Sequence, residues 1–284
     1  MRIDAALAHR LLRDQFPQWA DLPIVEPEVQ GIDNRTFRVG TDVSIRLPSA
    51  EGYVPQVEKE QTWLPILAPQ LSLPIARPLA MGSATEYYPW PWSVRAWIEG
   101  SVASVGSILD LAGFARDLAG FLGELQRIDP AGGPIAGPHS FFRGGDLAVY
   151  DEETRATIAA LGDRIDGRAA LATWDAARSA AANTKPVWVH GDIAPGNLIV
   201  RDGRLAAVID FGSSAVGDPA CDLVIAWTFF SGPSRDAFRE SMAGDDDLWA
   251  RARGWALWKA LIVFAADPLD DSAHRVIRDV TAET

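Results

Sequence analysis

Apolar and polar positions alternate in two short runs in the first fifty residues of the chain. The first run covers 36–39 and the second covers 43–47, with Gly40, Thr41 and Asp42 between them. Alternation with a period of two is typical of a strand with one buried face, and a glycine-containing turn between two such runs indicates a hairpin. The pattern therefore predicts an antiparallel pair of strands.

Helical spacing of apolar residues appears on both sides of this hairpin. Residues 3–16 and 55–69 show it, and Pro65 is expected to end or kink the second helix. Two more strand-like runs follow, near 74–80 and 92–98. We therefore expect the first hundred residues to form a small antiparallel sheet with a helix inserted.

The remainder of the chain is mainly helical in its pattern. Helices are expected over 107–128, over 150–182 in two pieces, and over most of the chain from residue 220 onward. A short strand at 186–190 and a tight hairpin turning at Asp202-Gly203 interrupt them. The sequence predicts an α+β fold of two lobes, a β-rich lobe of residues 1–98 and a larger, mainly helical lobe of residues 99–284.

Charge is unevenly distributed between the two expected lobes. The chain has 284 residues and a net charge of −12. Residues 1–98 hold 11 acidic and 9 basic side chains, whereas residues 99–284 hold 27 acidic and 17 basic ones. An acidic body argues against nucleic acid as a partner. It is compatible with a cationic small-molecule substrate, and equally with a simple contribution to solubility.

Cysteine content and hydropathy bear on location. Cys221 is the one cysteine, so the chain has no internal disulfide and no cysteine-based zinc site. The first sixteen residues read as an amphipathic helix rather than a signal peptide, and the longest strongly apolar run, 260–266, is too short to span a bilayer. We expect a cytoplasmic protein without a membrane partner.

The densest group of chemically useful residues lies in WVHGDIAPGNLIVRDGRLAAVIDFG, residues 188–212. Asn197 opens the first arm of the hairpin and Asp210 follows the second arm, so the two are predicted to be neighbours. Asp192 lies on the loop that leads to the same corner. Carboxylate and amide oxygens suit Mg²⁺, and Asp192 is then a candidate base for a substrate hydroxyl.

The motif H-G-D-x-x-x-x-N followed by I-D-F-G resembles the aminoglycoside phosphotransferase family, whose fold is similar to that of protein kinases. The segment GDPACDL at 217–223 looks like the family's next motif. The resemblance implies a kinase that uses ATP or GTP and Mg²⁺ to phosphorylate a hydroxyl of a small molecule. An aminoglycoside-like antibiotic is the expected acceptor. The sequence distinguishes neither ATP from GTP nor monomer from dimer.

The resemblance also implies roles for individual residues. Those of the central block are Asp192 as catalytic base, Asn197 and Asp210 as magnesium ligands, and His190 and Asp222 as supports of the catalytic loop. Those of the first lobe are Glu60 as the anchor of a phosphate-binding cation, and the backbone of Ala96 and Ile98 as the adenine contact.

Two features depart from the family pattern. The cation expected on the second hairpin strand is lysine in most relatives, and here it is Arg46, because the three lysines of the chain lie elsewhere. The segment GIDNRTF at 31–37 is a poor glycine-rich loop, in which Gly31 and Asn34 are candidates to shape a turn over the phosphates.

Three alternative functions stay open at this point. The first is a metabolic kinase of similar fold that acts on a sugar, choline or an amino-alcohol. The second is a metal-dependent hydrolase that uses His190, Asp192 and Asp210, which the scarcity of histidine disfavours. The third is an inactive nucleotide-binding regulatory module, suggested by Arg46 and disfavoured by the intact Asp192, Asn197 and Asp210.

Overall fold

The computed structural model describes the whole chain except residues 1, 28–29, 32, 183–184 and 284. It divides into two compact units. The first consists of residues 1–101 together with 206–212, and the second of residues 102–205 together with 213–284. The predicted division into residues 1–98 and 99–284 stays a prediction. The segment that carries Asp210 belongs to the first unit, whereas the one that carries Asp192 and Asn197 belongs to the second.

The first unit contains an antiparallel sheet of five strands in the order β1-β2-β3-β5-β4. The strands are β1 (Ile24–Val25), β2 (Asn34–Val39), β3 (Val43–Pro48), β4 (Pro78–Gly82) and β5 (Trp92–Ala96). The predicted hairpin is confirmed: Val39 pairs with Val43, and the pairing continues to Asn34 and Pro48. The two later strands are shorter than predicted, because the chain before Pro78 and after Ala96 leaves the sheet.

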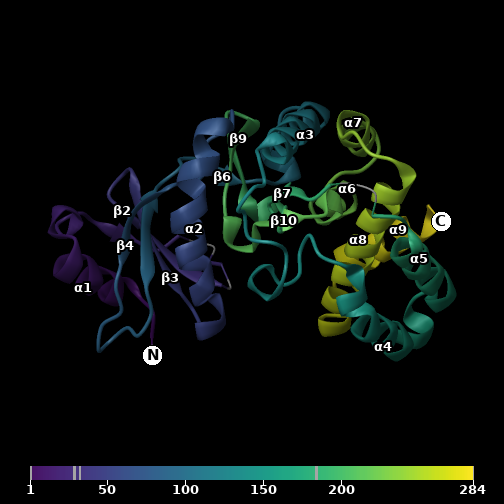
Figure 1. Ribbon diagram of the computed structural model, residues 1–284, viewed down its shortest axis with the longest axis horizontal. Helices are drawn as coiled ribbons and strands as arrows, with labels where there is room; N and C mark the ends of the chain where they lie inside the picture. Colours follow the sequence, from purple (N-terminus) through teal and green to yellow (C-terminus); the bar gives the residue numbers. More distant parts are fainter. Residues whose placement is uncertain (1, 28–29, 32, 183–184, 284) are drawn as a thin grey trace. The chain divides into compact units, whose positions relative to one another are not determined.

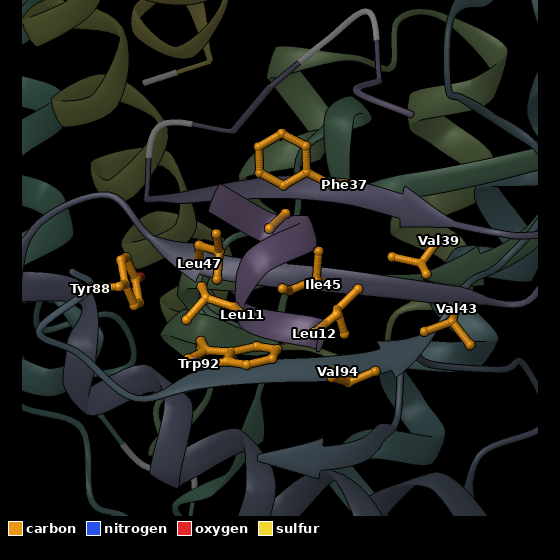
Figure 2. Close-up of a cluster of buried hydrophobic side chains, with 11 residues drawn as sticks. Leu11, Leu12, Phe37, Val39, Val43, Ile45, Leu47, Tyr88, Trp92 and Val94 are labelled. Atoms are coloured by element: carbon orange, nitrogen blue, oxygen red, sulfur yellow. The ribbon is translucent and has the colours of Figure 1, made fainter. Parts of the chain in front are cut away.

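One face of this sheet is apolar and is covered by α1 (Ala5–Gln15). Side chains at alternate strand positions form a buried cluster with Leu11 and Leu12 of α1, as Figure 2 shows. The strand residues of the cluster are Phe37, Val39, Val43, Ile45, Leu47, Trp92 and Val94. The cluster fixes the register, because a slip by one residue would turn these side chains to the opposite face.

The positions between these apolar residues point to the other face of the sheet. On β3 and β5 they include Arg46 and Arg95, and both side chains are buried. The pairing places Arg46 opposite Ser93, and Ser44 opposite Arg95, so the two arginines lie diagonally on neighbouring strands. Helix α2 (Val54–Leu67) contacts β4 and β5 and carries the buried Glu60.

Pro65 was expected to end or kink its helix, and the helix ends two residues after it, while a kink stays a prediction. Helix α2 continues through Pro65 and ends at Leu67, and a single 3-10 turn, Ala68–Gln70, follows it. A proline inside a helix removes one main-chain hydrogen bond, and here only one further turn of helix follows the lost bond. The helix therefore ends near the proline rather than at it.

The second unit is mainly helical. Its helices are α3 (Leu111–Arg127), α4 (Asp151–Leu161), α5 (Gly167–Ser179), α6 (Ile225–Thr228), α7 (Pro233–Ser241), α8 (Asp246–Ala266) and α9 (Asp271–Ala282). Helix α8 packs against both α5 and α9, which lie beside it in Figure 1. Its buried side chains include Trp249, Trp255 and Trp258, so these tryptophans belong to the core. The helical pattern predicted after residue 100 is confirmed.

Short strands of the second half carry the motif segment. Strand β7 (Val187–Val189) pairs antiparallel with β10 (Ala215–Gly217), with Val189 opposite Ala215. Strands β6 (Ser101–Val102), β8 (Leu198–Arg201) and β9 (Arg204–Val208) form a further sheet in that order. No helix within the described residues is long and apolar enough to cross a membrane.

Candidate active site

The loop after β7 has a backbone that only glycine fits well. Gly191 has a φ of +81°, and a β-carbon built on it would lie 2.4 Å from the carbonyl oxygen of Ser213. An L-residue would be strained by both its backbone conformation and this contact. Gly191 thus lets the loop turn sharply between the buried His190 and Asp192.

Asp222 holds this turn from below. It lies in the 3-10 helix η10 (Pro219–Val224) and is fully buried. Its two carboxylate oxygens accept hydrogen bonds from the backbone N–H groups of His190 and Gly191, each at 2.7 Å. Burial raises the pKa of Asp222, although these hydrogen bonds act in the opposite direction. The carboxylate satisfies two backbone donors that would otherwise be buried without partners.

Asp192 is held at three places but is not buried. Its backbone N–H donates to Nδ1 of His190 at 3.2 Å. Its Oδ2 accepts from Nδ2 of Asn197 at 3.1 Å, and its Oδ1 lies 3.1 Å from Nζ of Lys259. The side chain keeps 40% of its surface exposed, so a substrate hydroxyl can reach the carboxylate. The carboxylate is oriented and accessible, as a base requires.

The charge of Asp192 is stabilised by its neighbours. Burial acts to raise the pKa of Asp192, but the charge and hydrogen bond of Lys259, with the charges of His190 and Arg143, together outweigh it, so the pKa lies below its usual range. Asp192 is therefore ionised at neutral pH and ready to accept a hydrogen bond from a hydroxyl group.

Asn197 follows the same loop and uses its side-chain nitrogen internally. Nδ2 donates to the main-chain oxygen of Asp192 at 2.8 Å as well as to its carboxylate. The 3-10 turn Pro195–Asn197 sets this position, immediately before β8. With the nitrogen committed to Asp192, the amide oxygen of Asn197 is the atom left to act as a metal ligand.

Four charged side chains gather on the polar face of the sheet in the first unit. Nη2 of Arg46 lies 2.8 Å from Oδ1 of Asp210, and its Nη1 lies 3.5 Å from Oε1 of Glu60. Arg95 contacts Glu60 more closely, with Nη1 at 2.8 Å from Oε1 and Nη2 at 2.5 Å from Oε2. We call Arg46, Glu60, Arg95 and Asp210 the charged quartet.

Ion pairing within the quartet keeps Glu60 and Arg46 charged despite burial. Burial alone would raise the pKa of Glu60 and lower that of Arg46. The two arginines more than offset the first effect, and Asp210 and Glu60 more than offset the second, so the pKa of Glu60 is lowered and that of Arg46 is raised. Two cations and two anions balance in the quartet.

Asp210 also has an unusual backbone. Its φ is +65°, in the left-handed region that few residues other than glycine adopt. Such strain persists only where the surroundings enforce it, and it is concentrated at functional sites. A β-carbon on the next glycine, Gly212, would lie 2.7 Å from Oε1 of Gln56, so the end of the Gln56 side chain would have to shift.

The remaining predicted nucleotide contacts lie in the first unit. Asn34 begins β2, is buried, and donates from Nδ2 to Gln56 of α2 at 3.4 Å. Ile32, two positions before Asn34 in the weak glycine loop, lies outside the described residues. The backbone N–H of Ala96 donates to the carbonyl of Arg77 at 3.0 Å.

A cavity of about 550 Å³ lies beside Ala96 and Ile98. Its other walls are the end of α2 and the segment before β4, with Pro65, Pro69 and Ile75 among them. None of the described residues that line the cavity belongs to the charged quartet, so the cavity lies beside Ala96 and Ile98 and not at Arg46.

A magnesium site is compatible with the donor atoms present. Among the described residues, no three His, Cys, Asp or Glu side chains are grouped so that they could hold a metal ion. One carboxylate and one amide oxygen, from Asp210 and Asn197, suit a hard cation that takes its other ligands from water and phosphate. The two residues belong to different units, so their convergence stays a prediction from the hairpin.

The predicted site residues thus fall into two sets. Arg46, Glu60 and Asp210 meet in the first unit, while His190, Asp192, Asn197 and Asp222 meet in the second. Sequence reasoning missed Arg95 and Lys259. The alternation of β5 would have placed Arg95 on the face of Arg46, whereas no local pattern links Lys259 to Asp192.

Comparison with known proteins identifies similar structures. The GDP complex of aminoglycoside 2'-phosphotransferase-IIIa has a TM-score of 0.71 and 17% identity, with 99% of each chain covered. The macrolide 2'-phosphotransferase MphH from Brachybacterium faecium has a TM-score of 0.61 and 19% identity, with 98% of this chain and 97% of that chain covered. At these identities the similarity shows a shared fold. A search among curated proteins gave no match.

A family profile described as the phosphotransferase enzyme family (APH) matches residues 25–255. The match includes β2, β3, the quartet, the catalytic loop and Asp222. The predicted family resemblance and the α+β, kinase-like fold are confirmed by this match and by the similar structures. The chain belongs to the phosphotransferase enzyme family.

Proposed function

We propose that this phosphotransferase transfers the γ-phosphoryl group of ATP or GTP to a hydroxyl group of a small molecule, with Asp192 as the base. An aminoglycoside-like antibiotic is the proposed acceptor class. The location that fits this function is the cytoplasm, where nucleotide is plentiful and a chain with one cysteine stays reduced.

The observation that carries this proposal is the state of Asp192. Its carboxylate is ionised, exposed to the extent of 40%, and held on both oxygens by Lys259 and Asn197. A base in phosphoryl transfer orients the hydroxyl and takes its proton as the oxygen attacks phosphorus in line with the leaving group. Proximity and orientation supply much of the rate in such a reaction.

The charged quartet is proposed to serve the nucleotide. Glu60 is neutralised by Arg95, so Arg46 keeps a guanidinium that can turn from Asp210 to phosphate oxygens. Asp210 and the amide oxygen of Asn197 are the proposed magnesium ligands. When bound, Mg²⁺ would neutralise the phosphate charge. Adenine or guanine is proposed to bond the backbone of Ala96 and Ile98, and Asn34 to border the phosphates.

The acceptor class is supported by relatives and by charge. The similar solved structures include the GDP and kanamycin complex of APH(2")-IIia and the streptomycin and ATP complex of APH(2")-IIa. Residues 99–284 carry 27 acidic against 17 basic side chains, which favours a cationic ligand. A metabolic hydroxyl compound, such as a sugar or an amino-alcohol, is the alternative within the same chemistry.

A phosphorylation screen tests the proposal. The purified protein is incubated with Mg²⁺ and either ATP or GTP, and with kanamycin, gentamicin, streptomycin, a macrolide, choline and simple sugars. We expect at least one acceptor to gain one phosphoryl group by mass spectrometry. The parent protein should form this product, and the Asp192→Asn variant, used as the control, should not. The kinase assignment is wrong if, in the presence of Mg²⁺, no compound of the panel is phosphorylated and the nucleotide is not hydrolysed by water either.

The role of Asp210 in metal binding has a separate test. Asp210→Ala removes the proposed metal ligand, and we expect magnesium-dependent nucleotide binding and turnover to be lost. Calorimetric titration of nucleotide with and without Mg²⁺ measures this directly. A matched control is Asp202→Ala, at an exposed turn. Unchanged magnesium dependence in Asp210→Ala would remove this residue from the site.

A further inference from the structure

An ammonium group lies against the proposed base from an element distant in sequence. Lys259 is in the middle of α8, and its Nζ lies 3.1 Å from Oδ1 of Asp192. Both belong to the second unit, and 67 positions of sequence separate them. The loop 192–197, with the sequence DIAPGN, has no cation of its own.

The backbone position of Lys259 is fixed by the packing of α8. The helix begins at the N-cap Asp245, whose carboxylate accepts from the N–H of Leu248 at 2.8 Å. The preceding residue, Trp258, is buried and donates from Nε1 to Glu153 at 2.8 Å. Helix α8 also packs against α5, α9 and η10, and η10 carries Asp222. This packing sets the point from which the Lys259 side chain reaches Asp192.

The two oxygens of Asp192 are therefore held from two sides. Lys259 donates to Oδ1 and Asn197 donates to Oδ2, which leaves lone pairs on the exposed side of each oxygen. A carboxylate held by one partner could rotate about its χ2 angle, because that torsion is broad in aspartate. Two partners on different elements restrict this rotation and direct the remaining lone pairs outward.

We propose that Lys259 is a positioning residue of the phosphoryl-transfer reaction, which fixes the carboxylate of Asp192 toward the acceptor hydroxyl. This inference rests on the proposed role of Asp192 as the base. Lys259 itself contacts neither reacting atom; it acts through Asp192. In this chain the ammonium group beside the proposed base comes from helix α8 of the second unit and not from the loop 192–197.

The partial exposure of this ion pair makes the proposal testable. The side chain of Lys259 is 31% exposed and that of Asp192 is 40% exposed. An ion pair in contact with solvent adds little to folding stability. Replacing Lys259 should therefore leave the fold intact, and a change in turnover then reports on the orientation of Asp192.

The experiment compares Lys259→Met and Lys259→Arg with Lys185→Met, a matched change at an exposed lysine of the same unit. Hydrolysis of Mg²⁺-bound GTP and ATP by water and transfer to kanamycin are measured. We expect kcat of Lys259→Met to fall about 10- to 100-fold, as for a misplaced catalytic group, with the nucleotide KM unchanged. Lys259→Arg should recover part of kcat, because it keeps the charge and the donor.

A double-variant cycle separates positioning from a merely structural role. If Lys259 acts through Asp192, Lys259→Met should cost little further in an Asp192→Asn background. An equal loss in both backgrounds, or a kcat of Lys259→Met within about twofold of Lys185→Met, would overturn the inference. Near-normal turnover of Asp192→Asn would instead overturn the proposed function, so the two failures are distinguishable.

Discussion

The charged quartet and the surroundings of Asp192 both hold charged side chains next to partners, but they differ in how far these side chains are exposed to solvent. In the quartet, Glu60 and Arg95 are each 2% exposed, and every charge has an opposite charge beside it. Around Asp192, the side chains of Lys259 and Asp192 are 31% and 40% exposed, and the remaining partners are the amide of Asn197 and the ring of His190. The first group is paired in the protein interior, whereas the second is open to substrate.

This difference in exposure predicts which measured property a substitution changes. Removing one partner of a buried ion pair lowers the folding stability strongly, because the other charge remains buried, unpaired and without hydration. A half-exposed carboxylate that loses a partner is solvated instead. Changes in the quartet should therefore appear in both stability and nucleotide use, while changes at Asp192 should appear in turnover alone.

The largest expected effect is that of Asp192→Asn. The amide keeps the size of the side chain but cannot take the hydroxyl proton, so kcat should fall on the order of 10²–10⁴-fold. The melting temperature and the nucleotide affinity should stay near those of the parent, because the side chain is half-exposed. Steady-state kinetics and thermal melting measure the two. The matched control, Asp202→Asn, lies at an exposed turn where asparagine tolerates the positive φ of 54°.

Glu60→Gln should cause the largest loss of stability. It removes the negative charge between two buried arginines, which should lower the free energy of unfolding by about 3 kcal/mol. Urea unfolding measures the difference, with Glu58→Gln at an exposed position of the same helix as control. The folded-state pKa of Glu60 is lowered from 4.5, so its contribution is present above pH 4.5 and is lost as the pH falls through the folded value. The difference in the free energy of unfolding between the parent and Glu60→Gln should disappear in acid. A difference that persists there would contradict a charged Glu60 in the folded protein.

Arg46→Ala is expected to have a smaller effect, on nucleotide use. Arg95 still pairs with Glu60, and Asp210 is 34% exposed and can be solvated, so the fold should persist. The nucleotide KM should rise and kcat should fall, together by about tenfold or more in kcat/KM, and Arg46→Lys should recover part of this loss. Arg35→Ala, on the neighbouring strand, is the comparison. A larger loss in Arg35→Ala than in Arg46→Ala would assign the phosphate contact to Arg35.

The smallest predicted effect concerns Lys59, adjacent to Glu60 on α2. Burial lowers the pKa of Lys59 from 10.5 to about 8, although the charge of Glu60 acts against this. Between these two values the unfolded chain binds more protons, so this group makes stability rise with pH from about 8 to 10.5. Lys59→Met should remove this rise in stability with pH. It should also increase the free energy of unfolding at pH 7 by on the order of 1 kcal/mol. Urea unfolding at pH 7 and pH 10 checks it against Lys185→Met, and an unchanged pH slope would count against a desolvated lysine.

Much of the fold follows from short-range pattern. Alternation in the segments 36–39 and 43–47 predicted the hairpin, because a period of two gives one apolar and one polar face and α1 covers the apolar one. The boundaries were less predictable. Helix α2 continued through Pro65, since one lost hydrogen bond near a helix end is tolerated.

The sequence by itself predicted which residues of the central block are candidates for the chemistry. The spacing of Asp192, Asn197 and Asp210, and their place beside short strands, follow from local chain geometry, and their individual roles stay predictions. The partners of these residues were decided by tertiary structure. Arg95 pairs with Glu60 because β3 and β5 pair in a register that puts Arg46 and Arg95 on one face of the sheet. Lys259 contacts Asp192 because α8 packs beside the loop that carries Asp192. Both contacts join residues that are far apart in sequence, so they depend on packing and not on any local pattern.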